Sequence, residues 1–379
     1  MTETPPENFS DWRRLAWLLV LGLVLRLVLL TLIFTVGGEN WAHYLSTSDA
    51  GSYLKFARVI YTGAPPASLT FYDSRVFPGW PLGYGWLLWL LPAPAAALSA
   101  FILTAAAVPA LLYLLTRRFA VALALVWLPP AWLLATVHPI AEAFYLFTGL
   151  SALLAWQRGR LELAGFAAGL MCATKPYGIF LTLPLALACA RSQGRWSAVR
   201  LARFAWPIFI VGILCAIINL RLYGDVLHQF HVYAAPLAQL NLAGVDAFAG
   251  TSGHWSGPFT ALLTTPWRTP VPAWKIIYIY AHVVALFVLL ALPAWRCWRA
   301  RSHDALTLVL LGWLALNGAA IVCGGPYWGF HSFDRYFVWA CPAALALNAD
   351  LVEKHPRWHA TAAVISILLT LFAVHNHHA

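Results

Sequence analysis

The side chains best suited to chemistry lie at the ends of hydrophobic segments. Asp49 and Asp73 follow the first of these segments, in a stretch that begins STSDAGSYLKFARVIYTG. Later segment ends carry further charged residues and histidines: His138, Glu142, Lys175, His331, Asp334 and Arg335. A carboxylate can take the proton of a reacting hydroxyl, and cations can stabilise a departing anion. The set therefore predicts a polar site for proton transfer and anion binding.

Structural roles compete with chemistry for the two aspartates. Asp49 precedes an amphipathic stretch and can cap a helix there. We favour a functional role because acidic residues at the edge of a membrane usually serve function. Asp73 lies in FYDSR, so a turn or a pair with Arg75 is the favoured interpretation.

The remaining candidates also have structural alternatives. His138 and Glu142 are four residues apart and can bind each other on one helix face. Lys175 precedes a proline and can extend its ammonium to the membrane surface. Arg335 can pair with Asp334, although we favour a role in the site.

The composition predicts an all-α polytopic membrane protein that forms a single domain over 1–379. Of the 379 residues, 61% are hydrophobic and 10% charged, whereas soluble domains average about 25% charged. Segments long enough to span a bilayer predict about eleven transmembrane helices: 15–36, 95–116, 119–136, 140–156, 161–173, 177–190, 204–222, 273–294, 305–323, 336–350 and 359–375. The proline-flanked segment 80–91 is too short to span and is expected to be an interfacial or re-entrant helix.

Two long loops, 37–94 and 223–272, are predicted on the same side of the membrane. Most lysines and arginines fall in the short loops of the opposite side, which the positive-inside rule assigns to the cytoplasm. The net charge of +10 is thus a topology signal and does not indicate nucleic-acid binding. Because no secretory or retention signal is found, we expect a bacterial inner membrane, with Asp49 facing the periplasm or exterior.

Motifs for metals and nucleotides are missing from the sequence. It contains no HExxH, paired CxxC, GxSxG or GxxxxGK pattern, so we expect neither a metal nor a cofactor. The six cysteines are interpreted as small buried hydrophobic residues. An activated donor is then expected to reach the site through the bilayer.

Three ordered motifs resemble a known family. They are SDAGSYLKFARVIYTG followed by RVFPGWPL, HPIAEAFYLF followed by ATKPYGIF, and SFDRYFVWACPAAL. They are similar to membrane glycosyltransferases of the GT-C superfamily, and in particular to the GPI mannosyltransferase II type and its bacterial relatives. Two positions depart from the family pattern, since Ser48 stands where Trp is usual and Lys175 where Arg is usual.

The resemblance implies transfer of a hexose, with mannose favoured, from a polyprenyl-phosphate donor to a non-cytoplasmic hydroxyl with inversion. The acceptor would be a lipid, a glycan or a protein. Asp49 would be the general base, and Lys175 and Arg335 would bind the donor phosphate. Further residues would bind the acceptor or orient the site: Tyr53, Asp73, His138, Glu142, His331 and Asp334.

Two other classes of protein compete with this assignment. A transporter or flippase of a lipid-linked or small polar solute also needs membrane-embedded charges, but it favours broken helices that meet within the membrane. A non-catalytic assembly subunit with the same fold is the third possibility. The gathering of polar residues at one face favours the enzyme.

Overall fold

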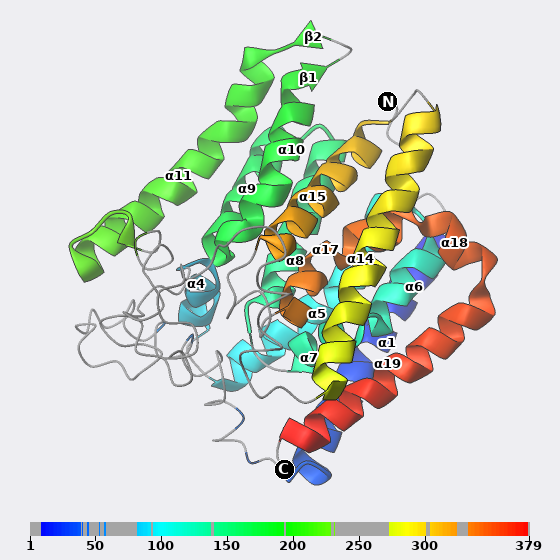
Figure 1. The fold of residues 1–379 in the computed structure, drawn as a ribbon. Helices are drawn as coiled ribbons and strands as arrows, with labels where there is room; N and C mark the ends of the chain where they lie inside the picture. The colour runs from blue at the N-terminus through cyan, green and yellow to red at the C-terminus, as the bar shows by residue number, and fades with distance from the viewer. Residues whose placement is uncertain are drawn as a thin grey trace.

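The computed structural model describes residues 9–38, 40, 44, 53, 57, 82–91, 94–137, 140–192, 195–228, 231, 273–300, 304–323 and 333–377. Most of the two predicted long loops lies outside these residues. Within them the fold is all-α apart from a two-stranded hairpin, as expected from the composition (Figure 1).

The first half of the chain builds the part of the bundle that holds the candidate site. Its elements are α1 (Phe9–Thr35), α4 (Leu82–Leu90), α5 (Pro94–Thr116), α6 (Phe119–Trp127), α7 (Pro130–Val137), α8 (Glu142–Gln157), α9 (Leu161–Thr174), η3 (Pro176–Gly178) and α10 (Ile179–Ala190). Helix α9 packs against both α8 and α11 (Ala198–Tyr223), and α5 packs against α1 and α8.

The second half begins with the hairpin β1 (Arg191–Ser192) and β2 (Arg195–Trp196), in which Arg191 pairs with Trp196. Beyond α11, the described helices are α14 (Ala273–Ala300), α15 (Ala305–Val322), α17 (Phe333–Leu347), α18 (Ala349–Lys354) and α19 (Pro356–His377). Helix α15 lies between α10 and α17, and α19 packs along α7.

Five of the described helices are long and apolar enough to cross a membrane. The pair α6 and α7 passes the same test together and is bent by 64°, so up to six spans are supported by length and composition. Each of the eleven predicted ranges falls on a helix or on this bent pair. The membrane-type fold therefore agrees with the sequence, but the number eleven is not confirmed.

The outer helices present apolar side chains to their surroundings. On α11, Phe209 is 69% exposed, and Ile213 and Ile217 are more than half exposed. Such a continuous exposed apolar face is unstable in water and stable against hydrocarbon. The surface is thus consistent with an integral membrane protein.

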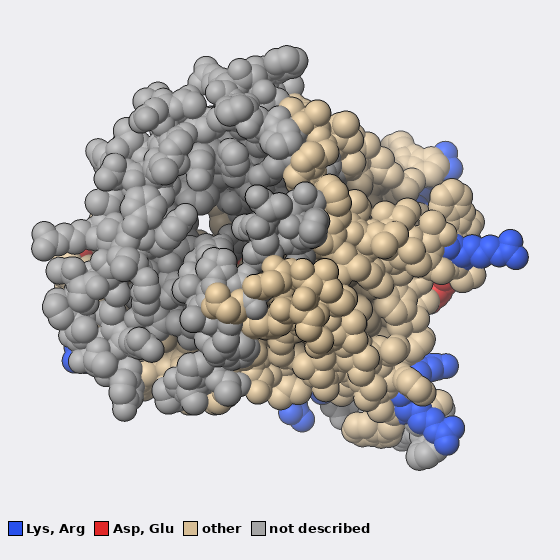
Figure 2. Space-filling model, turned by 90° about the horizontal axis from the view of Figure 1, so that it is seen from below, with Lys and Arg blue, Asp and Glu red and all other residues tan. Residues whose placement is uncertain are grey.

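Charged side chains link the helix ends on one side of the bundle. The Arg118 guanidinium is 2.8 Å from carboxylate oxygens of both Asp350 and Glu353, which joins the start of α6 to α18. Figure 1 shows the hairpin, the end of α14, the start of α15 and α18 along one edge, with α4 on the other side. Seen from below, the described surface is largely uncharged, and its Lys and Arg side chains project from the rim (Figure 2).

Two glycines, one turn apart, allow α9 and α11 to approach closely. A Cβ on Gly165 would collide with the Phe204 carbonyl group, and one on Gly169 would lie 3.2 Å from the Ile208 Cα. Small residues at four-residue spacing are a common means of packing helices in membranes. Since the atoms opposite Gly165 belong to backbone, a larger residue requires the helices to separate.

We predict that Gly165→Ala lowers the free energy of unfolding by about 1–3 kcal/mol, the usual cost of overpacking. Gly212→Ala is the matched control, because Gly212 is also helical and nothing lies within 4 Å of its Cβ position. Alanine should be neutral there or stabilise the helix by up to about 1 kcal/mol. Thermal unfolding in detergent measures both, and equal melting temperatures would contradict the close α9–α11 contact.

Candidate functional site

A buried ion pair lies where α8 begins and α9 ends. The Lys175 Nζ is 3.0 Å from Glu142 Oε1, and the Glu142 side chain is fully buried. Glu142 is the first residue of α8, and Lys175 follows the last residue of α9. Burying a charge is costly unless it is paired, so contact between these two residues keeps the ends of both helices at the same depth.

The position of Lys175 follows from the proline after it. A residue before proline is forced out of the helical conformation, and Lys175 is extended, with φ −150° and ψ 135°. Helix α9 therefore ends there, and the chain continues through η3 into α10. This break directs the lysine side chain away from the helix axis and into the bundle.

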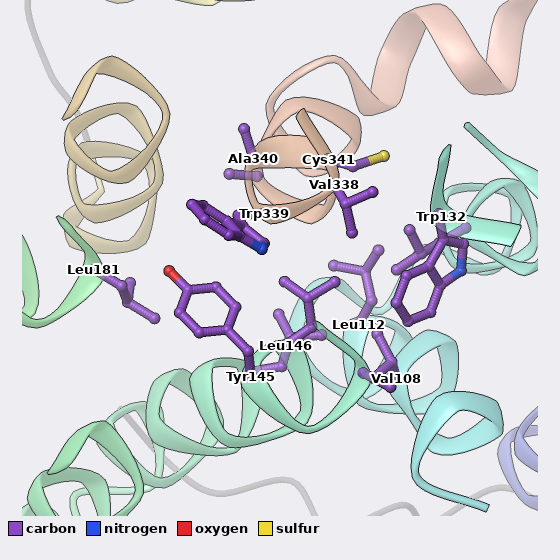
Figure 3. Packing of buried hydrophobic residues seen from close by; sticks show 14 of the residues in the cluster. Val108, Leu112, Trp132, Tyr145, Leu146, Leu181, Val338, Trp339, Ala340 and Cys341 are labelled. Atoms are coloured by element: carbon purple, nitrogen blue, oxygen red, sulfur yellow. The ribbon is translucent and has the colours of Figure 1, made fainter. Parts of the chain in front are cut away.

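Aromatic rings from three helical segments cover the ion pair. The Lys175 Nζ lies 5.3 Å from the centre of the Trp339 ring of α17, a distance suited to a cation–π contact. The Tyr177 ring is 4.7 Å from Trp339, and the Tyr145 hydroxyl donates to the Tyr177 carbonyl. Figure 3 shows Tyr145 of α8 facing Trp339 across the bundle. The ion pair thus has a largely apolar, aromatic wall.

The first loop reaches the same region through two tyrosines. The rings of Tyr53 and Tyr84 meet edge to face at 4.9 Å, and both are fully buried. Tyr84 belongs to α4 and also lies 6.3 Å from Phe144, two residues after Glu142. Helix α4, which corresponds to the short helix expected over 80–91, therefore packs beside the start of α8.

A glycine brings α4 onto the end of α9. A Cβ on Gly83 would lie 2.8 Å from the backbone nitrogen and the side-chain oxygen of Thr174. Since Thr174 directly precedes Lys175, the position of α4 is coupled to that of the lysine. Tyr84 was not among the predicted site residues, and its sequence context, GYGW, indicates only an interfacial aromatic.

Of the predicted site residues, Glu142 and Lys175 are in direct contact, and Tyr53 packs on Tyr84, whose ring lies near Phe144 of α8. Arg335 and Asp334 lie in the first turn of α17, four and five residues before Trp339, and their side chains are outside the described part. The remaining candidates also lie outside the described residues: Asp49, Asp73, His138 and His331. Their predicted roles therefore stay predictions.

An apolar pocket of about 430 Å³ lies between α9, α10 and α11. Ala173 and Pro176, on either side of Lys175, line it together with Ile208 and Val211 of α11. Ile179 forms part of the same wall and is half exposed on the outer surface. The size and lining suit a hydrocarbon chain that enters from the bilayer.

A second buried charge lies deeper, within α1. Arg26 is 1% exposed, donates to the Gly22 carbonyl at 2.9 Å, and lies 5.4 Å from the centre of the Trp132 ring. Charges at this depth are costly and generally functional.

Among the described residues, no group of three or more His, Cys, Asp or Glu side chains is arranged to hold a metal ion.

Comparisons with protein-family models, with curated proteins and with solved structures find no match to this chain. The similarity to GT-C enzymes consequently rests on the three motifs of the sequence.

Replacing Glu142 by Gln should lower the free energy of unfolding by about 3–5 kcal/mol, because it leaves the Lys175 ammonium buried without its counter-charge. Replacing both residues, as Glu142→Gln with Lys175→Met, should recover much of this loss. Denaturant or thermal unfolding in detergent provides the measurement.

The pair Glu162–Arg203 is the matched control, since it joins α9 to α11 but both side chains are largely exposed. Glu162→Gln should cost at most about 1 kcal/mol. Equal losses for Glu162→Gln and Glu142→Gln would contradict a buried, energetically coupled pair at the candidate site.

Proposed function

We propose that the protein is an integral membrane glycosyltransferase that moves a hexose, mannose first among the candidates, from a polyprenyl-phosphate donor to a hydroxyl outside the cytoplasm. The observation that carries this proposal is the buried Glu142–Lys175 pair, which is covered by Trp339. A cation, a carboxylate and aromatic rings suit the binding of a phosphate and a sugar.

The proposed reaction is a single inverting displacement. The acceptor oxygen attacks the anomeric carbon while the bond from that carbon to the phosphate oxygen breaks. The phosphate leaves with the bonding electron pair, and the acceptor proton passes to Asp49. Because the leaving group is already an anion, the site needs cations around it more than it needs a strong acid.

Glu142 supports the proposed role of Lys175 in two ways. A neighbouring carboxylate favours the charged form of a buried lysine, and the pair fixes the direction of the ammonium. An ammonium carries three N–H donors, so Lys175 can bind Glu142 and a phosphate oxygen together. Arg335, four residues before Trp339 on α17, is the proposed second cation.

The apolar pocket supports a lipid-linked donor. Its walls include Pro176, which directly follows Lys175, and residues of α11, whose outer face is exposed and apolar. A chain bound there would have its polar end near the level of the ion pair. This arrangement would let the lipid remain in the bilayer while its phosphate enters the site.

A transporter or flippase is the second candidate, and a different observation favours it. Helices α6 and α7 are bent by 64° at a short break and together are apolar enough for one span or a re-entrant loop, and Arg26 lies over Trp132 just beyond the break. Broken helices and buried charges within the membrane are typical of transport proteins.

Asp49→Asn should abolish sugar transfer, with a loss of about 10²–10⁴-fold from removal of the base. The assay uses purified protein in detergent, labelled polyprenyl-phosphate mannose and a membrane extract as the source of acceptor. Glu162→Gln is the control and should retain activity, because that exposed carboxylate pairs with Arg203 at the start of α9, at the other end of the helix from Lys175. Turnover like that of the wild type in Asp49→Asn would remove Asp49 from the mechanism.

Sealed proteoliposomes separate the two candidate functions. With the same labelled donor in one leaflet, a transferase makes a labelled product without moving intact donor. Appearance of intact labelled donor in the other leaflet, with no new product, would establish the flippase and overturn the enzyme. Polyprenyl-phosphate glucose and galactose, run in parallel, identify the sugar.

A further inference from the structure

Tyr84 has a buried hydroxyl that the proposed mechanism does not use. The side chain is fully buried, and its oxygen has no hydrogen-bond partner among the described residues. Burying a hydroxyl without a partner costs free energy, so each such group in a folded protein calls for an explanation, and one explanation is a role in ligand binding. The ligand would then supply the missing partner.

The Tyr84 ring is closely packed. It packs edge to face on Tyr53 and contacts Phe144 of α8. The preceding residue, Gly83, sets α4 directly against the Thr174 backbone, where even a Cβ would collide. A hydroxyl on such a closely packed ring does not need to be ordered when a ligand binds, which is favourable for recognition.

The surroundings of Tyr84 keep its hydroxyl protonated. Burial raises the pKa of Tyr84 well above its usual value, and the negative charge of Glu142 and the neighbouring Tyr44 raise it further. The hydroxyl therefore remains a donor at all physiological pH values. Glu142, by contrast, can only accept while it is charged.

The Tyr84 ring lies near Phe144, two residues after Glu142, so the Tyr84 donor and the Glu142 acceptor belong to the same region. A donor and an acceptor near each other together suit an alcohol. An alcohol oxygen accepts from a tyrosine, while its own proton is donated to a carboxylate. A fully ionised phosphate or carboxylate carries no such proton that it could donate to Glu142. Sugar hydroxyls have the required chemistry.

We propose that the Tyr84 hydroxyl donates a hydrogen bond to a hydroxyl oxygen of the transferred sugar, and that it serves as a residue for recognition of the glycosyl group. This inference rests on the proposed function for the identity of the ligand. It adds a contact for the sugar to the contacts already proposed for the phosphate and the lipid chain.

Binding of two lipids to Tyr84→Phe tests the inference. The probes are polyprenyl-phosphate mannose and polyprenyl phosphate without sugar, titrated into detergent-solubilised protein by calorimetry. The variant should bind the glycosylated lipid about tenfold more weakly, the effect of losing one hydrogen bond. Its affinity for the bare lipid should be unchanged. Tyr113→Phe is the control, because that hydroxyl bonds to Asp11 at the opposite end of the bundle.

The melting temperature supplies a second test. Removing an unpaired buried hydroxyl should leave the melting temperature of Tyr84→Phe unchanged or raise it, whereas loss of a structural hydrogen bond would lower it. A lower melting temperature, or equal affinity of wild type and variant for a glycosylated lipid that the wild type prefers to bare lipid, overturns the role of Tyr84. A wild type that prefers none of the mannosyl, glucosyl and galactosyl lipids to bare lipid overturns the proposed function itself.

Discussion

The burial of one opposite-charge pair constrains much of the candidate site. Neither Glu142 nor Lys175 is stable in an apolar interior alone, so the start of α8 and the end of α9 must remain in contact. The short turn between α8 and α9 makes this possible by returning the chain directly alongside itself. Pro176 then ends α9 at the lysine, and Trp339 of α17 covers the ammonium. The pair thus holds the start of α8, the end of α9 and Trp339 of α17 in contact.

Helix α9 connects this pair to its neighbours through small residues. Gly165 and Gly169 admit the α11 backbone on one side, while Thr174 receives Gly83 of α4 on another. The same helix therefore positions the lysine, one wall of the apolar pocket and the first-loop tyrosines. Its sequence, LELAGFAAGLMCAT, is that of an ordinary short apolar segment. The two glycines in it, Gly165 and Gly169, are what allow the close approach of α11.

The sequence predicts the helices and names Glu142 and Lys175 as candidates, but it leaves the partner of Glu142 open. Hydropathy is a property of local segments, so the predicted ranges fall on helices. Whether each range is a full span depends on the length of its unbroken helix, which only the structure gives. Glu142 had a close sequence neighbour, His138, as an alternative partner; its ion pair with Lys175 depends on the antiparallel packing of α8 and α9. The break between α6 and α7 does have a signal in the adjacent Pro129 and Pro130, which the prediction of one continuous span overlooked.

The packing around that break bears on the choice between enzyme and transporter. A transporter must open a path through the membrane where its helices are broken, so side chains at such a point need room to rearrange. Trp132, immediately after the break, is instead fully buried and lies beside Val108 and Leu112 of α5 (Figure 3). Close-packed interiors resist such rearrangement. Apart from Arg26, which lies over Trp132, the region of the break is packed with apolar core. This packing favours a fixed site for chemistry at the Glu142–Lys175 end over a moving pathway at the break.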